Sequence, residues 1–282
     1  MKKILIIVVF VLGAVGFWYL RHEQAWSYTF HVTFLNIGQG DATLINFDNG
    51  QKMLVDCGPN KSVLARLSKA LPPWDRTIDY LLITHPDLDH YGGCVDVLRR
   101  YTVHNIITNG RSKQNDSYWE EVEAAMNNEN AARTAMVAPT KWTIAGDAVE
   151  FLSPDPNLGL IVKSDDSNNY SIVFRLIHKE NRFLFTGDME EPLERVLTRK
   201  YCGLTIPAVG CSALTASVLK VGHHGSNSSS GSDFLKAVKP VTAVISVGKN
   251  HFGHPSPRVL KRLERAGATI VRTDQLGDIM LK

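Results

Sequence analysis

The chain of 282 residues has few cysteines and little net charge, and each shortage excludes a class of function. None of its four cysteines belongs to a Cys-x-x-Cys pair, so the sequence offers no structural zinc knuckle. The formal net charge is only +3, whereas non-specific binding to nucleic acid depends on many lysine and arginine contacts to phosphate. A nucleic-acid substrate would therefore have to be held by a local patch. The chain also has no internal repeat and no long linker.

The first 26 residues differ from the rest of the chain. Lys2 and Lys3 precede an uncharged run over residues 4–20, and Arg21 follows it. A basic start before an apolar stretch indicates a secretory signal, and the run also reaches the lower limit for a membrane-spanning helix. A cleaved signal peptide and an uncleaved membrane anchor fit this pattern equally well, and a buried soluble helix fits it least. Either of the first two exports residues 27–282.

Export bears on the cysteines, because disulfides form in oxidising compartments. Cys202 and Cys211 are nine residues apart in an irregular stretch, where a loop disulfide and two partly buried thiols are both reasonable expectations. Cys57 and Cys94 lie beside the polar motifs considered below, and we expect both to be small packed residues.

Residues 27–282 alternate short apolar segments with helical ones, which predicts one α/β domain with two sheets. We expect a hairpin where the strands 171–177 and 182–185 flank a short polar turn. The other expected strands are residues 29–35, 42–47, 52–55, 80–84, 105–108, 133–137, 148–152, 218–221, 243–246, 269–272 and 278–281. The expected helices are residues 62–70, 93–101, 117–127, 193–200, 232–238 and 257–266.

Four potential metal ligands lie within six residues, directly after the strand expected at 80–84. They are His85, Asp87, Asp89 and His90. Imidazole and carboxylate together suit Zn²⁺, Mn²⁺ or Fe²⁺. Such groups make poor core residues, because buried charges need partners. A polar turn that caps the next helix is the alternative explanation.

Three further strands end in residues that can bind metal. Asp56 follows the strand at 52–55, Asp188 follows the strand at 182–185, and His223 and His224 follow the strand at 218–221. Each alone has an ordinary explanation as a turn, a helix cap or a surface loop. Ligand sites in α/β sheets gather outside strand ends, so four such ends together predict a shared metal site.

These motifs resemble the metallo-β-lactamase superfamily and, more closely, the hydrolase domain of ComEC-type competence proteins. The resemblance extends from about residue 30 to residue 282. It rests on NIGQGD at 36–41, VDCG at 55–58, THPDLDHYGG at 84–93, NNYS at 168–171, TGD at 186–188, HHGS at 223–226 and GHPS at 253–256. It implies an αββα sandwich with the site at the sheet edges.

Position by position, the resemblance implies two metal sites that share a bridging carboxylate. The implied ligands are His85 and Asp87 at the first site, Asp188 as the bridge, and Asp89, His90 and His224 at the second. His223 is the alternative to His224, which is favoured because the superfamily commonly places this ligand just before a glycine. Asp56 would orient a ligand histidine from behind, and Asp41 would have a similar supporting role.

The sequence departs from the usual His-x-His-x-Asp-His pattern, because Asp87 replaces the second histidine. The superfamily also has a further histidine before the bridging aspartate, and neither His104 nor His178 is convincingly placed for that role. Asn168 or Asn169 is the expected substitute. Oxygen ligands shift the first site toward harder ions such as Mn²⁺ or Mg²⁺. For the site as a whole we expect one or two divalent ions, zinc or manganese. The same departure from the usual pattern argues against a β-lactamase.

The chemistry expected from this resemblance is hydrolysis of a phosphodiester in DNA by metal-activated water. Asp89 would orient the water, and His254 would contact phosphate or protonate the leaving group. Ser226, in the loop 225–231, would belong to a phosphate cradle, although a flexible loop explains that segment equally well. Lys220 and Asn169 are further candidates for substrate contact. The alternatives are a hydrolase of a small ester, lactone or phosphoester, and a non-catalytic DNA-uptake module.

Overall fold

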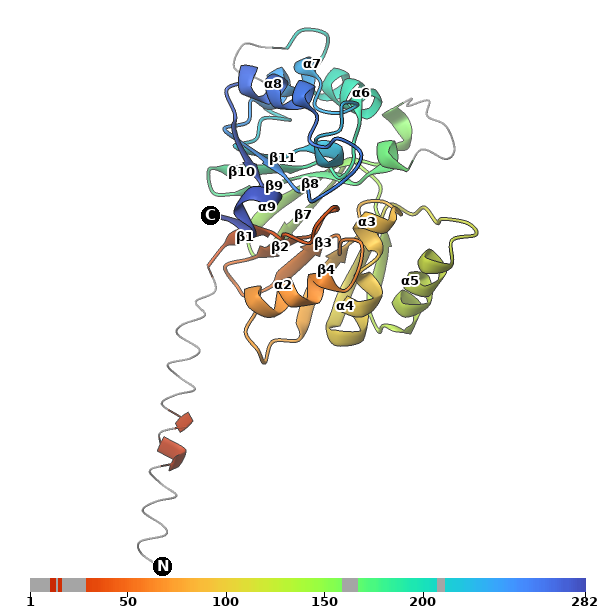
Figure 1. The fold of residues 1–282 in the computed structure, drawn as a ribbon, viewed down its shortest axis with the longest axis vertical. Helices are drawn as coiled ribbons and strands as arrows, with labels where there is room; N and C mark the ends of the chain where they lie inside the picture. Colours follow the sequence, from red (N-terminus) through yellow and green to blue (C-terminus); the bar gives the residue numbers. More distant parts are fainter. Residues whose placement is uncertain (1–10, 14, 17–28, 159–166, 207–210) are drawn as a thin grey trace, which may run out of the picture.

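The computed structural model describes residues 11–13, 15–16, 29–158, 167–206 and 211–282. Within these residues, short apolar segments form two seven-stranded sheets that pack face to face (Figure 1). In spatial order the first sheet contains β14 (Ile279–Leu281), β1 (His31–Phe34), β2 (Thr43–Asn46), β3 (Lys52–Val55), β4 (Thr77–Leu82), β5 (Thr102–Thr108) and β6 (Ala132–Ala135). The second contains β13 (Thr269–Arg272), β12 (Thr242–Ile245), β11 (Val218–Lys220), β10 (Asn181–Phe185), β9 (Val173–His178), β8 (Asp147–Ser153) and β7 (Thr140–Ile144).

Helices cover the outer face of each sheet, which completes an αββα sandwich (Figure 1). On the first sheet lie α2 (Ser62–Ala70), α4 (Cys94–Arg100) and α5 (Ser117–Asn128), and on the second lie α6 (Glu191–Cys202), α7 (Ser232–Val238) and α8 (Pro257–Arg265). The short helices α3 (Leu88–Tyr91) and α9 (Thr273–Leu276) and the 3₁₀ turns η1 (Pro156–Leu158), η2 (Asn168–Tyr170) and η3 (Gly222–Gly225) lie in the connections. The predicted α/β class with two sheets is therefore confirmed.

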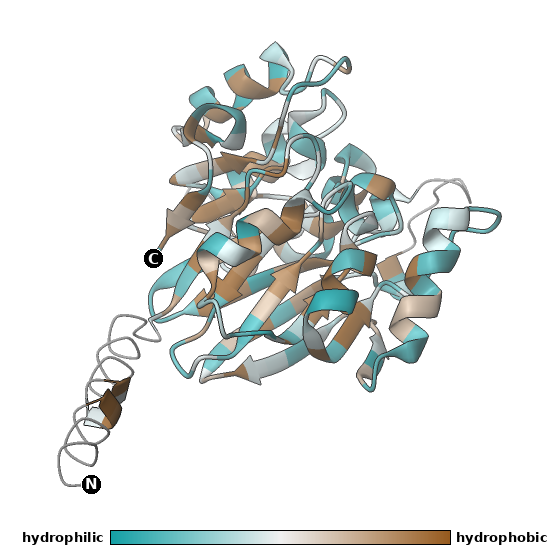
Figure 2. Ribbon diagram, turned by 60° about the horizontal axis from the view of Figure 1, so that its bottom comes forward, coloured by the Kyte–Doolittle hydropathy of each residue, from teal (hydrophilic) through white to brown (hydrophobic). Residues whose placement is uncertain are grey.

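The central strands are buried on both faces, and their sequences show why. Along β10, Phe183 and Phe185 point into the core between the sheets, while Leu184 packs with the outer helices, as the two-residue period of a strand requires. Phe185 stacks on Phe174 of β9, with ring centroids 4.6 Å apart, and also contacts Phe34 of the first sheet. Aromatic packing of this kind joins the sheets, and the apolar strands are visible as the brown layers of Figure 2.

The sequence located most strands and helices but missed three. The strand 52–55 and the helices 62–70 and 232–238 have the predicted bounds, and β9 and β10 pair antiparallel as the predicted hairpin. The missed elements are β7, α3 and α9. The segment TKWTI of β7 has a single large apolar ring, and α3 and α9 are one-turn helices, so none of the three has a clear periodic pattern.

The leader predicted over residues 1–26 lies mostly outside the described residues. Among the described residues, no helix has the length and apolar character needed to cross a bilayer.

Two disulfides close loops in the domain. The first joins Cys57 to Cys94, so the expectation that both are simply packed residues was wrong. The second joins Cys202 to Cys211, which is one of the two alternatives that the sequence left open. Cys57 directly follows Asp56 and Cys94 begins α4, so the first disulfide joins the loop after β3 to the segment that follows the predicted ligands at 85–90. Their separation of 37 residues hides this pairing in the sequence.

The two disulfides should differ in their effect on stability. Replacing Cys57 and Cys94 with alanine should lower the free energy of unfolding by roughly 4 kcal/mol, against roughly 2.5 kcal/mol for Cys202 and Cys211, because the longer closed loop restricts the unfolded chain more. The loops span 37 and 9 residues. Urea unfolding without reductant measures both losses. A larger loss from the Cys202–Cys211 pair would contradict the structure.

Candidate metal centre

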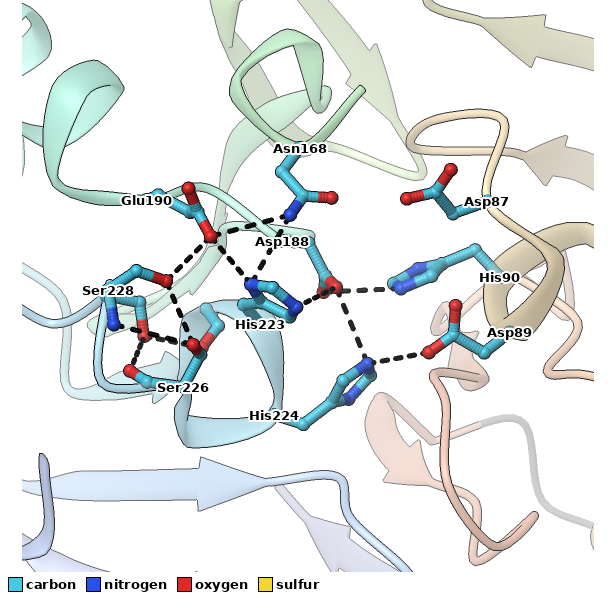
Figure 3. Close-up of polar contacts among 12 residues, drawn as sticks. Asp87, Asp89, His90, Asn168, Asp188, Glu190, His223, His224, Ser226 and Ser228 are labelled. Carbon is cyan, nitrogen blue, oxygen red and sulfur yellow. Dashed lines mark hydrogen bonds and ion pairs between the residues drawn. The ribbon is translucent and has the colours of Figure 1, made fainter. Parts of the chain in front are cut away.

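The loops that follow four strands meet at one edge of the sandwich (Figure 3). In the first sheet β3 and β4 run parallel, so Asp56 and residues 85–90 emerge side by side. In the second sheet β10 and β11 are also parallel, which places Asp188 next to the histidine pair of η3. The sequence predicts that these strand-end residues lie together, and the parallel order of the strands explains why they do.

Asp188 lies at the centre of this group, between two buried histidines (Figure 3). Its Oδ1 is 3.2 Å from Nε2 of His90, and its Oδ2 is 3.5 Å from Nε2 of His224. The same His224 nitrogen is 3.1 Å from Oδ2 of Asp89, whose side chain is 36% exposed. The cluster is thus closed behind and opens to solvent at Asp89.

Two further carboxylates fix the orientation of these histidines from the other side. Asp56 accepts a hydrogen bond from Nδ1 of His90 at 2.8 Å and two more from Thr84. Asp41 lies 3.4 Å from Nδ1 of His224, a nitrogen that also donates to a backbone carbonyl. Because each Nδ1 is engaged, each Nε2 is directed at the centre, as in histidine ligands held by an outer carboxylate. The supporting positions predicted for Asp56 and Asp41 match this geometry.

A second set of donor atoms includes His85. Its Nδ1 lies near the hydroxyls of Thr84 and Ser171, and its ring centroid is 4.1 Å from that of His90. Ligand atoms of His85, His90 and Asp188 lie within 4.8 Å of one another, and so do those of Asp89, His90 and His224. The two groups share His90, and the space suits one ion or two adjacent ions.

Asp87 is set apart from both groups (Figure 3). Its Oδ1 is 3.2 Å from Nζ of Lys113, and its Oδ2 accepts a hydrogen bond from Ser167 at 2.8 Å. The distance from Oδ2 to Nε2 of His85 is 3.5 Å. The aspartate that replaces the usual histidine is thus already partnered by Lys113 and Ser167.

The charges in the cluster shift its pKa values strongly. Burial lowers the pKa of His90, but Asp188 and Asp56 outweigh burial and raise it well above its usual range. Burial also opposes the charged form of His224, yet Asp188 and Asp41 raise its pKa to about 10. The pKa of Asp188 is held well below its usual range, because the charges of His224 and His90 exceed the effect of burial.

Several buried ligand atoms have no hydrogen-bond partner among the described residues. They are Nε2 of His85, Nε2 of His90, Oδ1 of Asp188 and Oδ1 of Asp41. A buried polar atom without a partner is costly, and most native structures avoid it. Histidine and carboxylate atoms left open in one small space fit a divalent cation, which would satisfy them together.

His223 borders the centre and is held by a residue that the sequence did not single out. Its Nδ1 lies 2.9 Å from Oε1 of Glu190, and its Nε2 lies 3.8 Å from Oδ2 of Asp188. His223 and His224 both have positive φ angles, 47° and 51°, which non-glycine residues rarely adopt. This strained turn directs both rings at Asp188, with His224 the deeper of the two.

Two residues predicted to contact substrate are structural instead. Lys220 is only 3% exposed, and its ammonium lies 2.6 Å from Oδ2 of Asp41, so it neutralises that carboxylate within the protein. Asn169 is buried, and its side-chain oxygen accepts hydrogen bonds from the backbone of Glu190 and Leu193. Both predictions were wrong because burial cannot be judged from motif position alone.

The serine-rich loop 225–231 is tied by hydrogen bonds to Glu190 and Glu194, which occupy the groups that a phosphate would need. Glu194 accepts hydrogen bonds from the backbone N–H groups of Ser230 and Gly231. A phosphate cradle ahead of α7 would need these same N–H groups. Burial raises the pKa of Glu194 to about 7. The hydroxyl of Ser226 contacts that of Ser228, which donates to Glu190 (Figure 3). Ser226 is therefore close to the centre without a free backbone cradle around it.

His254 lies beside the centre, as expected, with its ring centroid 5.3 Å from that of His223. Burial, together with the positive charges of His223 and His224, lowers its pKa. Asn168, the proposed substitute for a missing histidine, has its amide nitrogen 3.4 Å from Nδ1 of His223. Sequence offered no signal for Glu190 or Lys113, because their partners are distant along the chain.

An αββα sandwich with a histidine–aspartate cluster at the sheet edges defines a class of metal-dependent proteins that are mostly hydrolases. Residues 35–249 match the family described as "Metallo-beta-lactamase superfamily", and the chain belongs to this family.

Its relatives include ComEC-type competence proteins. The chain is 27% identical to ComE operon protein 3 of Bacillus subtilis, over 89% of this chain and 33% of that protein. It is 32% identical to competence protein ComA of Neisseria gonorrhoeae, over 95% of this chain and 34% of that protein. The chain thus spans about a third of the length of these relatives.

Solved structures share the fold at low sequence identity. The metallo-β-lactamase fold protein YhfI of Bacillus subtilis aligns with a TM-score of 0.57 and 12% identity, covering 90% of this chain and 99% of YhfI. Zn²⁺-bound PqqB of Methylobacterium extorquens aligns with a TM-score of 0.52 and 11% identity, covering 89% of this chain and 99% of PqqB. These likenesses support the fold alone.

Metal binding should release protons. The pKa values of His90 and His224 are both raised in the metal-free protein, chiefly by Asp188, which favours their protonated forms, and a metal ligand must give up that proton. Affinity should therefore rise as pH rises. Calorimetric titration with Mn²⁺ or Zn²⁺ at pH 7, in two buffers of different ionisation enthalpy, should show about one or two protons released. Binding with no proton release would contradict this electrostatic picture.

Proposed function

We propose that this chain is an exported, metal-dependent phosphodiesterase that acts on DNA. The observation that carries the proposal is the cluster of Asp89, His90, Asp188 and His224, in which the described residues give Nε2 of His90 and Oδ1 of Asp188 no hydrogen-bond partner beyond their own ion pair. The competence proteins among its relatives favour DNA over a small ester as the substrate.

The residues fall into a stronger and a weaker metal site. His90, His224, Asp89 and Asp188 would hold one ion, zinc or manganese. His85 would hold a second ion together with Asp188, which would bridge the two. Asp87 would contribute little while Lys113 and Ser167 occupy its carboxylate. When bound, such an ion acts as a Lewis acid toward phosphate and lowers the pKa of water.

The protein residues around the cluster would orient the reactants. Asp89 is the solvent-facing carboxylate, and we assign it to hold the attacking water by a hydrogen bond. His223, fixed by Glu190, borders the same space and would donate a hydrogen bond to a phosphate oxygen. His254 would lie on the leaving-group side of that phosphate, next to His223. Asp56 would keep His90 aligned throughout.

The two disulfides support export. Disulfides persist in oxidising compartments and are rare in the reducing cytosol. In this chain one of them joins the loop that carries Asp56 to the start of α4, which follows the 85–90 motif. A leader within residues 1–26, either cleaved or kept as a membrane anchor, is part of the same proposal.

Activity on DNA should depend on the metal cluster. Asp89→Asn and His224→Asn should each lower kcat/KM for a fluorescent oligonucleotide by about 100-fold or more, because the first removes the charge of a ligand and the second removes the ligand ring. Chelator should abolish cleavage by the wild type. The assay is cleavage of single- and double-stranded DNA by metal-loaded protein.

Matched substitutions away from the cluster provide the control for this assay. Asp233→Asn and His104→Asn change exposed residues of the same types and should leave cleavage intact. The proposal fails if metal-loaded wild type cuts no DNA with Zn²⁺ or Mn²⁺. Hydrolysis of small esters alone would identify a small-molecule hydrolase, and DNA binding without cleavage would identify a non-catalytic module.

A further inference from the structure

The connection between β12 and α8, residues 246–256, presents an exposed aromatic ring near the metal centre. Phe252 in this loop is 62% exposed. A single exposed apolar residue is common on protein surfaces and needs no explanation by itself. The significance of Phe252 therefore depends on what surrounds it.

A series of ring contacts links Phe252 to the metal centre. Its ring centroid is 5.7 Å from that of His254, and the two planes are 29° apart. His254 in turn lies 5.3 Å from His223, which borders Asp188. These separations lie in the range of ordinary aromatic contacts. Phe252 is thus two ring contacts from a histidine of the metal centre.

The loop is held in one shape by the side chain of Asn250. Its amide nitrogen donates to two backbone carbonyls, one of them that of His254, and its oxygen accepts the N–H groups of Phe252 and His254. The backbone N–H of Ser256 donates to the carbonyl of Gly225, which fastens the loop to the turn after the histidine pair. The loop therefore holds Phe252 in position before a partner binds, and this preorganisation lowers the entropic cost of binding.

The surroundings of the loop in the sequence are basic, although the whole chain is almost neutral. Residues 234–263 contain no aspartate or glutamate. Lys249 and Arg258, which flank Phe252 in this stretch, are both exposed. An acid-free segment with exposed cations is the local patch that a polyanion needs on a protein with little net charge.

We propose that Phe252 is a stacking platform for an unpaired base next to the phosphodiester held at the metal centre, with Lys249 and Arg258 contacting the backbone of the same strand. The inference rests on the proposed phosphodiesterase function and adds a preference for single-stranded nucleic acid. In a duplex, neighbouring base pairs cover both faces of a base, so only an unpaired base can stack on the ring. Such stacking tolerates any base sequence.

Kinetics on three substrates test the platform. Phe252→Ala should lower kcat/KM for a single-stranded oligonucleotide about 10-fold more than for bis(p-nitrophenyl) phosphate, which has no base to stack. Most of this loss should lie in KM, and the preference over duplex DNA should fall with it. Phe252→Trp should retain the preference, because indole also stacks on bases.

Trp74→Ala is the matched control. Trp74 is a large, partly exposed aromatic residue in the turn before β4, at the opposite end of that strand from His85. Its substitution should change none of the three activities. The inference is overturned if Phe252→Ala cuts single strands as well as wild type does while the small diester is still hydrolysed, a result that leaves the proposed function intact.

A measurement of oligonucleotide binding to the full chain, made in the presence of chelator, tests the stacking role of Phe252 separately from the proposed phosphodiesterase function. Fluorescence anisotropy with a labelled single-stranded oligonucleotide should show binding about 10-fold weaker for Phe252→Ala. If no phosphodiester is hydrolysed by any form of the protein, the proposed function fails, and this measurement alone decides the role of Phe252. Weaker binding then supports the platform, and unchanged binding overturns it.

Discussion

The arrangement of the whole site depends on one carboxylate, that of Asp188, placed between two buried histidines. Asp188 belongs to the second sheet, and its partner His90 belongs to the first, so their contact joins the two halves of the sandwich at the site edge. The aromatic core between the sheets fixes this spacing from below. Without His90 and His224, the negative charge of Asp188 would lose its two main compensating charges, and proteins rarely tolerate a buried charge without partners.

The supporting residues repeat one principle on both sides of Asp188. Asp56 orients His90, and Asp41 lies against His224 while Lys220 neutralises it. Acids and bases thus alternate outward from Asp188, through His90 to Asp56 and through His224 and Asp41 to Lys220. The strained turn at 223–224 and the disulfide between Cys57 and Cys94 hold the two loops that complete this pattern.

Sequence alone predicted the parts of the structure that depend on local pattern. Strand ends carrying Asp56, Asp188 and His224 indicated a shared edge, because parallel strands direct their ends to the same side. It could not predict burial, so Lys220 was assigned to substrate although it is an internal counter-charge. It could not predict partners distant along the chain, such as Glu190 for His223 or Lys113 for Asp87. These depend on how loops from different strands fold over the edge.

The central claim is that Asp188 is indispensable to metal binding, whereas the diverged Asp87 is not. Equilibrium dialysis against Mn²⁺ or Zn²⁺, followed by elemental analysis of folded protein, tests it directly with Asp188→Asn and Asp87→Asn. Asp188→Asn should bind no ion, and Asp87→Asn should keep the ion at Asp89 and His224. Full metal content in Asp188→Asn, or complete loss in Asp87→Asn, would contradict it.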